Sequence, residues 1–299
     1  MATEHFKSKK FHKNTAKVIG QAIMIIEEYL TDGFDLTLRQ LYYQFVARGL
    51  IPNSQSEYHK LGSIISDARL AGMIDWDAIK DRGRAMDENW HALNPRHLMA
   101  GIASEYAIDL RSDQDYYIEV WVEKEALAGV LERVCSKLDV PWFACKGYVS
   151  QSAMYEASKR FLAAEEDAKE TIIFHLGDHD PSGIDMTRDI NDRLRMFGSS
   201  VEIDRIALNM DQVDEYDPPP NPAKLTDSRC GGYIDKFGDE SWELDALDPH
   251  TLSALIRKSV DDYTDPDRFE EREILQDQQR EILTKISCNW DEVSGFLKD

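Results

Sequence analysis

Cysteine is scarce in this sequence, and long apolar runs are missing from it. The four cysteines, at positions 135, 145, 230 and 288, form no C-x-x-C pair. This spacing indicates neither a zinc site nor a disulfide framework, so we expect reduced, mostly buried thiols. No apolar stretch approaches roughly 18 residues, and the charged segment MATEHFKSKKFHKNTAK has no signal-peptide core. We therefore predict a cytoplasmic protein without a membrane span.

Charge is divided unevenly along the chain. The formal net charge is −21, which disfavours contact with a phosphate backbone. Residues 1–100, however, carry 13 Lys and Arg against 12 Asp and Glu, whereas residues 101–299 carry 22 against 44. We therefore expect any DNA contact on the N-terminal part, while the acidic remainder forms solvated surface or gathers to hold cations.

The N-terminal part has the pattern of three helices followed by a short β-hairpin. Apolar residues recur at helical spacing over 15–31 and 56–71, and Thr37 with Gln40 gives a capping box for a helix from 38 to 48. The segment MIDWDAIKDRGR then predicts two extended pieces around a turn. This order is typical of a winged helix, and a plain helical bundle is the alternative. We place a CAP-like winged-helix domain at 1–90.

From residue 116 onward, predicted strands alternate with predicted helices. The strands are YYIEVWV, PWFACKGY, TIIFHLG and VEIDRIALN, and amphipathic helical segments separate them. This alternation predicts an α/β fold with a parallel, Rossmann-like sheet. We place this domain at 115–265, with a polar connection at 91–114 before it and a helical C-terminal tail at 266–299 after it.

Acidic residues follow two of the predicted strands. Glu123 comes directly after the first, and Asp178 and Asp180 follow the third, in GDHDPSGID. Because the carboxyl ends of parallel strands share one edge of a sheet, these residues are expected to lie together. Three converging carboxylates need a cation between them, and hard oxygen ligands suit Mg²⁺. The alternative is a pair of acidic loop residues that cap a helix, and His179 is expected to be an exposed loop residue.

These segments resemble the Toprim domain, and most closely the A subunit of topoisomerase VI and its relatives that make meiotic double-strand breaks. VEKEAL is similar to the acidic strand end of that family, and GYVS at 147–150 is similar to its G-Y-x-S/D element. The segment from Asp178 to Ile184 is similar to its D-x-D-P-x-G-I element. The family also has an R-[DE]-[IL]-[YF]-Y motif in a preceding winged helix, which residues 39–43 match at four of five positions. The resemblance covers about residues 15–260 in the same domain order.

The resemblance implies an activity and a role for each matching residue. Tyr43 corresponds to the nucleophile that attacks a DNA phosphodiester and becomes 5′-phosphotyrosyl, and Arg39 corresponds to the arginine that accompanies it. Glu123, Asp178 and Asp180 correspond to the acids that bind Mg²⁺, and we also place Glu123 in the catalytic set. The implied assembly is a homodimer on double-stranded DNA in which each tyrosine meets the metal site of the other copy.

Two features depart from the pattern of the family. Gln40 stands where the family usually has an acid, and little sequence precedes the first predicted helix, where the family docks its ATPase partner. No Walker-type nucleotide-binding loop occurs in the sequence. ATP-driven strand passage is therefore expected only with a separate ATPase subunit.

Helical spacing separates the two adjacent tyrosines of LTLRQLYYQF. Leu41, Tyr42 and Phe45 fall on one apolar stripe, which predicts Tyr42 for the core. Tyr43 is rotated about 100° further and lies one turn after Arg39 on the same face. Because a phenol has a pKa near 10, a reactive tyrosine needs a nearby cation and an exposed position. We therefore expect Tyr43 to be exposed and to lie near a cation. The alternative is that Tyr43 packs against the wing.

Basic residues on the third helix and the wing are the candidates for DNA contact, with a solvated helix face as the alternative. They are Lys60, Arg69, Lys80, Arg82 and Arg84. Three functions are open at this point. The first is Mg²⁺-dependent DNA cleavage by tyrosine transesterification, the second is a Toprim endonuclease that uses metal-activated water with Tyr43 structural, and the third is a non-catalytic DNA-binding or regulatory protein.

Overall fold

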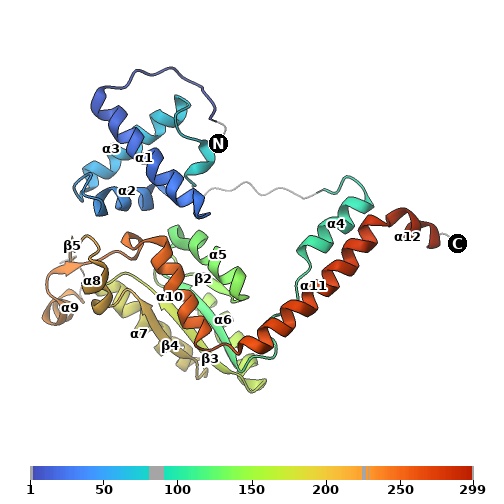
Figure 1. The fold of residues 1–299 in the computed structure, drawn as a ribbon. Coiled ribbons are helices and arrows are strands. Elements are labelled where there is room, and N and C mark those ends of the chain that lie inside the picture. Colours follow the sequence, from blue (N-terminus) through green and yellow to red (C-terminus); the bar gives the residue numbers. More distant parts are fainter. Residues whose placement is uncertain (1–2, 81–90, 224–226, 228, 298–299) are drawn as a thin grey trace.

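The computed structural model describes residues 3–80, 91–223, 227 and 229–297. Figure 1 shows a helical N-terminal unit, an α/β unit beside it, and a helical arm that projects away from both. The predicted α/β fold with a parallel sheet is confirmed. The described part of the chain contains no helix that combines the length and the apolar character needed to cross a membrane.

Three helices form the N-terminal unit, close to the predicted limits. The capping box predicted for the second one is present, since the Thr37 backbone N–H donates to the Gln40 side chain and the Gln40 N–H donates to the Thr37 hydroxyl. Side chains such as Ile19, Leu41 and Ile65 are buried in a common apolar core. The helices are α1 (Lys13–Thr31), α2 (Leu38–Ala47) and α3 (Gln55–Leu70).

The segment after α3 differs from the predicted wing. It contains the 3-10 turn η1 (Trp76–Ala78), which begins where the Asp75 side chain accepts a hydrogen bond from the Asp77 N–H at 3.0 Å. An Asx-type turn of this kind competes with extended backbone, which is why the first predicted strand does not form. Ile79 makes an isolated parallel bridge to Leu36 instead. The second predicted extended piece lies outside the described residues.

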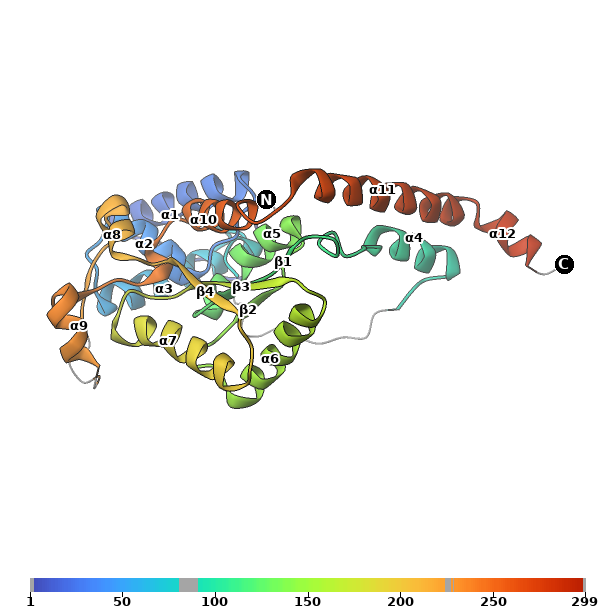
Figure 2. The same ribbon diagram turned by 90° about the horizontal axis from the view of Figure 1, so that it is seen from below.

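A four-stranded parallel sheet forms the centre of the α/β unit, in the order β2-β1-β3-β4. Helices α5 and α10 pack on one face and α6 and α7 on the other, and each face has its own apolar core (Figure 2). The strands are β1 (Tyr116–Val122), β2 (Trp142–Ala144), β3 (Glu170–Leu176) and β4 (Glu202–Ala207). The covering helices are α5 (Ala128–Leu138), which follows the 3-10 turn η2 (Glu125–Leu127), α6 (Gln151–Glu166), α7 (Pro181–Met196) and α10 (Pro249–Asp261).

An irregular segment connects β4 to α10 and passes the carboxyl edge of the sheet. Part of it was predicted as a proline-rich loop, and its short elements were not foreseen. They are α8 (Met210–Tyr216), β5 (Asn221–Pro222), α9 (Cys230–Phe237), β6 (Glu240–Ser241) and the 3-10 turn η3 (Leu244–Ala246). The β5 and β6 strands pair in antiparallel fashion. This segment brings η3 to the edge where the predicted acids lie.

The projecting arm consists of α4 (Pro95–Glu105), α11 (Pro266–Cys288) and α12 (Trp290–Phe296). The first of these lies within the segment predicted as a polar connection, so that segment is not simply a linker. Asn94 caps α4 by accepting from the His97 N–H at 2.9 Å, and Pro95 stands at the first helical position. The predicted helical tail is present as α11 and α12.

Candidate metal centre and tyrosine pocket

The ends of β1 and β3 place two of the predicted acids together. The strands pair from Tyr116 opposite Glu170 to Val122 opposite Leu176, so the residues that follow them emerge side by side. The Glu123 N–H donates to the Leu176 carbonyl at 2.8 Å, and the Glu123 carboxylate accepts from the Asp178 N–H at 2.9 Å. Burial raises the pKa of Glu123, and the hydrogen bond from the Asp178 N–H opposes that rise.

Asp180, the third predicted acid, caps α7. Its carboxylate accepts from the Gly183 N–H at 2.6 Å and from the Ser182 hydroxyl at 3.1 Å. A β-carbon on Gly183 would lie 2.2 Å from the Asp178 carbonyl oxygen and 3.1 Å from the Glu123 carboxylate, so only glycine fits at this position. The P-x-G sequence after Asp180 therefore lets the helix start against the loop that carries the acids.

Arg205, on β4, stabilises the loop that carries Asp178 through hydrogen bonds to its backbone. This residue was not identified from the sequence. Its guanidinium donates to the carbonyl oxygens of Gly177 at 2.8 Å, Asp178 at 2.6 Å and Gly183 at 3.0 Å. Burial lowers the pKa of Arg205 to about 10, against the opposing effect of the carboxylates of Glu123 and others. This buried cation fixes the backbone of the loop and offsets part of its negative charge.

The carboxylates that meet most closely are those of Asp178, Glu243 and Asp245. One oxygen from each lies within 4.8 Å of the other two, and of the described His, Cys, Asp and Glu residues these three form the group suited to a metal ion. Glu243 and Asp245 flank the start of η3, and the Leu244 N–H between them donates to the Asp178 carboxylate at 2.8 Å. We call these three residues the acid cluster. It shares only Asp178 with the predicted set.

Lys124 lies within the acid cluster. Its ammonium is 2.8 Å from the Asp178 carboxylate and 3.0 Å from that of Asp245, and it also contacts Glu243. Burial alone would lower the pKa of Lys124, but the carboxylates of Asp245, Asp178 and Glu243 outweigh burial and raise it. The lysine is therefore charged and balances part of the negative charge of the cluster.

Arg39 brings helix α2 to the same place. Its guanidinium is 2.7 Å from the Glu243 carboxylate and 2.7 Å from the Asp245 carboxylate. It also lies over the ring of Tyr43, at 5.8 Å from the ring centre. The arginine and tyrosine predicted on one helical face are thus adjacent, and they meet the acid cluster of their own chain.

Both tyrosines of the pair are buried, which differs in part from the prediction. Tyr42 is 4% exposed and Tyr43 is 5% exposed, so the prediction for Tyr42 is confirmed and the expected exposure of Tyr43 is wrong. Burial raises the pKa of Tyr43 to about 12, with Asp245 and Glu243 adding to the rise and Arg39 opposing it. The reason is that α2 packs against η3 rather than facing solvent, so the second face of the helix is covered as well.

Tyr43 nevertheless lies on the wall of a cavity of about 620 Å³ between the N-terminal unit and the α/β unit. Tyr42 and Tyr58 also line it, with their ring centres 5.3 Å apart, and Arg39 and Glu243 mark the end next to the acid cluster. The remaining lining residues are polar or small: Asn53, Ser54, Gln55, His59, Asn221 and Pro222. A ligand in this cavity would reach both the phenol and the guanidinium.

The residues predicted for DNA contact occupy different environments. The Lys60 side chain is mostly exposed and pairs with Glu57 at 3.3 Å, and Lys80 pairs with Asp77 at 3.0 Å. Arg69 stacks on Trp76, with its guanidinium 4.6 Å from the ring centre, and donates to the Ile79 carbonyl at 3.1 Å. Arg82 and Arg84 lie outside the described residues.

His179 was expected to be exposed, and that prediction is wrong. Its side chain is 1% exposed and its ring nitrogen hydrogen-bonds the Tyr233 hydroxyl at 2.8 Å. Its backbone pairs with Trp242, which covers it from the segment between β4 and α10. Burial lowers the pKa of His179 to about 4, so the imidazole is neutral near pH 7.

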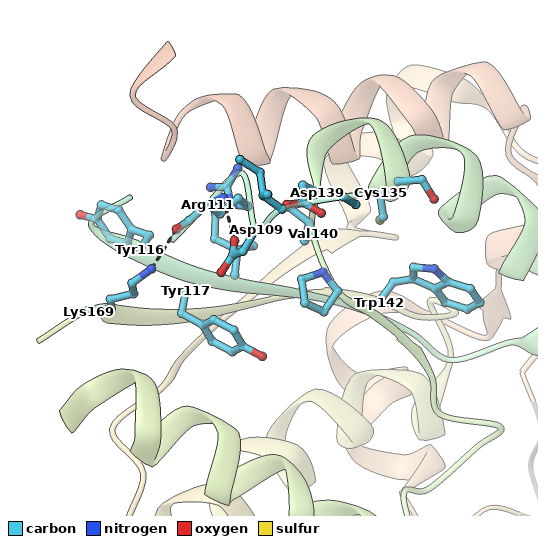
Figure 3. Close-up of a pocket in the computed structure, with 14 residues that line it drawn as sticks. Asp109, Arg111, Tyr116, Tyr117, Cys135, Asp139, Val140, Trp142 and Lys169 are labelled. Atoms are coloured by element: carbon cyan, nitrogen blue, oxygen red, sulfur yellow. Dashed lines mark hydrogen bonds between the residues drawn. The ribbon is translucent and has the colours of Figure 1, made fainter. Parts of the chain in front are cut away.

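A second cavity, of about 650 Å³, lies at the opposite edge of the sheet, where the strands begin (Figure 3). Arg111 and Lys169 line it beside Tyr116 and Trp142, and Lys169 donates to the Arg111 carbonyl at 2.8 Å. The Arg111 guanidinium donates to the Thr264 hydroxyl at 3.1 Å and so ties this edge to the start of the arm. None of the described residues that line this cavity was predicted for catalysis, metal binding or DNA contact.

The residues that complete the site have no clear signature in the sequence. Lys124 lies next to a predicted acid, but nothing in its neighbourhood indicates that it faces other carboxylates. Glu243 and Asp245 form an E-x-D pair in SWELDALDP, far along the chain and outside any predicted strand. Comparison with protein-family models and with curated proteins found no match.

Proposed function

We propose that this chain cleaves double-stranded DNA by Mg²⁺-dependent tyrosine transesterification, with Tyr43 as the nucleophile and a Toprim-like acidic centre. The observation that supports it is the position of Arg39. This residue lies one helical turn before Tyr43 and contacts Glu243 and Asp245, which converge with Asp178 at the sheet edge. A nucleophile, a guanidinium and a set of metal-ligating oxygens therefore meet at one place, as this reaction requires.

The acid cluster suits a hard divalent cation. Its ligand atoms are carboxylate oxygens, and Asp178 and Asp245 are buried. Asp178, Glu243 and Asp245 would hold Mg²⁺, which when bound stabilises negative charge on a phosphate oxygen. Glu123 supports this arrangement through its hydrogen bond from the Asp178 N–H, and Asp180 supports it by fixing the start of α7.

In the proposed step the Tyr43 hydroxyl oxygen forms a bond to phosphorus, and the bond from phosphorus to the 3′ oxygen breaks. The products are a 5′-phosphotyrosyl enzyme and a free 3′-hydroxyl, so the phenol proton ends on the leaving oxygen. In the free chain Arg39 is held by Glu243 and Asp245. Neutralising these carboxylates frees the guanidinium to contact the phosphate and to favour the phenolate of Tyr43.

Helices α1 to α3 supply the DNA-binding surface in this proposal. We propose that they act as a DNA-binding unit of the winged-helix type and that Lys60 and Lys80 contact phosphates. Lys60 now pairs with Glu57 and Lys80 with Asp77. Because ion pairs at the surface contribute little, either lysine could leave its carboxylate and bind a phosphate instead.

Two other functions are each favoured by one observation. The burial of Tyr43 favours a Toprim endonuclease in which metal-activated water attacks the phosphate and the tyrosine is structural. The engagement of the acid cluster by Lys124 and Arg39 favours a DNA-binding protein without catalysis, because these cations already balance the carboxylates.

One experiment separates these functions. Purified protein is incubated with supercoiled DNA and Mg²⁺, denatured, and tested for DNA covalently attached to protein. We expect an adduct that Tyr43→Phe abolishes and Tyr42→Phe retains, since Tyr42 is an equally buried neighbour whose hydroxyl bonds Asn53 at 2.9 Å. Cleavage that survives Tyr43→Phe without an adduct would assign the reaction to water. DNA binding without cleavage would favour the non-catalytic protein.

A further inference from the structure

The cavity beside Tyr43, which we call the tyrosine pocket, is bridged by contacts between the N-terminal unit and the α/β unit. Helix α2 faces the α/β unit (Figure 1), and Arg39 on this helix is 2.7 Å from the Glu243 carboxylate. Next to α3, the Asn53 side-chain amide donates to the Asn221 side chain at 3.0 Å. All five residues line the pocket. While both contacts persist, a substrate that reaches Tyr43 is confined to this space.

The size of the tyrosine pocket suits one nucleotide and excludes a duplex. Its volume is about 620 Å³, and pockets of about 300–1,000 Å³ enclose one drug-sized molecule, which is the size class of a nucleotide. A compact space of that volume is roughly 9 Å across, whereas the major groove of B-DNA alone is about 12 Å wide. Tyr43 is only 5% exposed and lines this pocket. A phosphodiester therefore reaches the Tyr43 hydroxyl as part of an unpaired position in the strand.

Aromatic rings form a continuous row along the pocket, starting from Arg39. The guanidinium of this arginine lies 5.8 Å from the ring centre of Tyr43. The ring centre of Tyr42 is 5.2 Å from that of Tyr43 and 5.3 Å from that of Tyr58. His59 continues the row, with its ring centre 5.7 Å from that of Tyr58. The pocket therefore runs from a charged end beside the acid cluster to an aromatic end on α3.

The aromatic end of the pocket has both a fixed wall and accessible side chains. The Tyr42 hydroxyl accepts from the Ser54 N–H at 2.7 Å and donates to the Asn53 side chain at 2.9 Å, so the Tyr42 ring is held in place. Tyr58 is half-buried, and Gln55, one turn before it on α3, is exposed. Bases of any sequence stack on aromatic side chains, and side-chain amides bind the polar edges of bases. A nucleotide has the same order of groups as the pocket, with a charged phosphate at one end and a flat base at the other.

We infer that the tyrosine pocket takes one unpaired nucleotide of the DNA, with its phosphate beside Arg39 and its base against Tyr58. The duplex then has to open at the position that is cleaved, and opening costs least where the base is already unpaired. Lys60 directly follows the pocket residue His59 on α3, and its mostly exposed side chain is available to phosphates of the neighbouring duplex. This inference rests on the proposed function and deepens it by naming the form in which the substrate is bound.

Equilibrium binding tests the inference without cleavage. Fluorescence anisotropy in EDTA compares a fully paired DNA duplex with the same duplex carrying one extra, unpaired thymidine nucleotide in one strand. We expect the unpaired nucleotide to tighten binding by at least about 10-fold, because the duplex is already open at that position. Tyr58→Leu should lower this ratio of affinities to near one, since it removes the flat ring and keeps an apolar side chain.

The matched control is Tyr155→Leu, which removes a 51% exposed tyrosine of α6 that does not line the pocket. This variant should keep the preference for the unpaired nucleotide, and both variants should bind the fully paired duplex as the unaltered chain does. Circular dichroism checks that the helices of each variant persist. Equal affinity of the unaltered chain for the two duplexes, or a preference that survives Tyr58→Leu, would overturn the inference.

Photochemical cross-linking locates the base in the unaltered chain, so it does not depend on the folding of a variant. The unpaired thymine is replaced by 5-iodouracil, the complex is irradiated, and the modified peptide is identified by mass spectrometry. We expect attachment to Tyr58, within the segment 49–60. Cross-links confined to residues that do not line the pocket would exclude the proposed position of the base.

Failure of this inference and failure of the proposed function give different results. A covalent adduct at Tyr43 without any preference for the unpaired nucleotide would remove the inference and leave the proposed function standing. Tighter binding of the unpaired nucleotide and a cross-link at Tyr58, without cleavage in Mg²⁺, would support the inferred pocket and contradict transesterification. Absence of binding to either duplex would contradict both.

Discussion

Replacement of Lys124 by methionine tests the electrostatics of the acid cluster. Methionine keeps most of the length of the side chain and removes only the ammonium. The carboxylates of Asp178, Glu243 and Asp245 then lose the one cation that contacts all three of them, and Arg39 remains beside Glu243 and Asp245. Breaking a buried ion pair by removing one partner costs about 3–5 kcal/mol. For a domain of this size we expect the Tm to fall by roughly 10 °C.

Thermal unfolding of wild type and Lys124→Met, each with EDTA and with Mg²⁺, measures both the loss and its reversal. A divalent cation should raise the Tm of the variant more than that of wild type, because in the variant it displaces no ammonium. Saturation at a hundred times the Kd corresponds to about 2.7 kcal/mol. Lys146→Met is the control, since its pair with Glu125 at 2.7 Å is exposed and should contribute at most about 1 kcal/mol.

Two outcomes of this experiment would contradict the reasoning. If Lys124→Met unfolded at the temperature of wild type in EDTA, the lysine would not be balancing a buried set of charges. If Mg²⁺ stabilised the variant no more than wild type, the carboxylates would not form a cation site when the ammonium is removed.

Two further substitutions, at Gly183 and at His175, test the elements on either side of the loop that carries Asp178. Gly183→Ala should destabilise the protein by about 2 kcal/mol or more, because the new carbon would lie 2.2 Å from the Asp178 carbonyl oxygen. The control is Gly20→Ala on α1, where the new carbon has no neighbour within 4 Å, so this change should be neutral or stabilising. Urea unfolding measures the stability of both variants. Burial, with a contribution from Arg205, lowers the pKa of His175 to about 3. The unfolded chain therefore binds more protons below pH 6.5, so wild type should lose about 2 kcal/mol from this residue between pH 7 and pH 5. His175→Gln should remove that loss, and an unchanged pH dependence would show that the histidine is not held neutral.

The helices and strands could be predicted where the local pattern agrees with the tertiary structure. The strand at β1 and the capping box at Thr37 lie where the sequence places them, because their apolar period or cap is complete within a few residues. The turn η1 and the helix α4 were missed for the opposite reason. In the first, the Asp75 side chain competes with extended backbone. In the second, the helix is stabilised by a partner, α11, that is distant in the sequence.

The site was only partly predictable, because its residues come from separate parts of the chain. Strand ends indicate Glu123 and Asp178, since the register of a parallel sheet fixes their edge. Glu243 reaches the same edge through an irregular segment, and no periodicity marks where such a segment returns. Helical spacing predicted that Arg39 lies on the same face of its helix as Tyr43. It did not predict that Arg39 would contact Glu243.

The burial of Tyr43 has a chemical consequence for the proposed cleavage. With a pKa of about 12, the phenol is deprotonated in roughly one molecule in 10⁵ at pH 7. Two of the causes besides burial are the charges of Asp245 and Glu243, and these same carboxylates pair with Arg39. Neutralising these carboxylates therefore acts twice, by lowering the pKa of the phenol and by releasing the guanidinium. On the proposed function, a cation at the acid cluster is thus required to activate the tyrosine as well as to bind the phosphate.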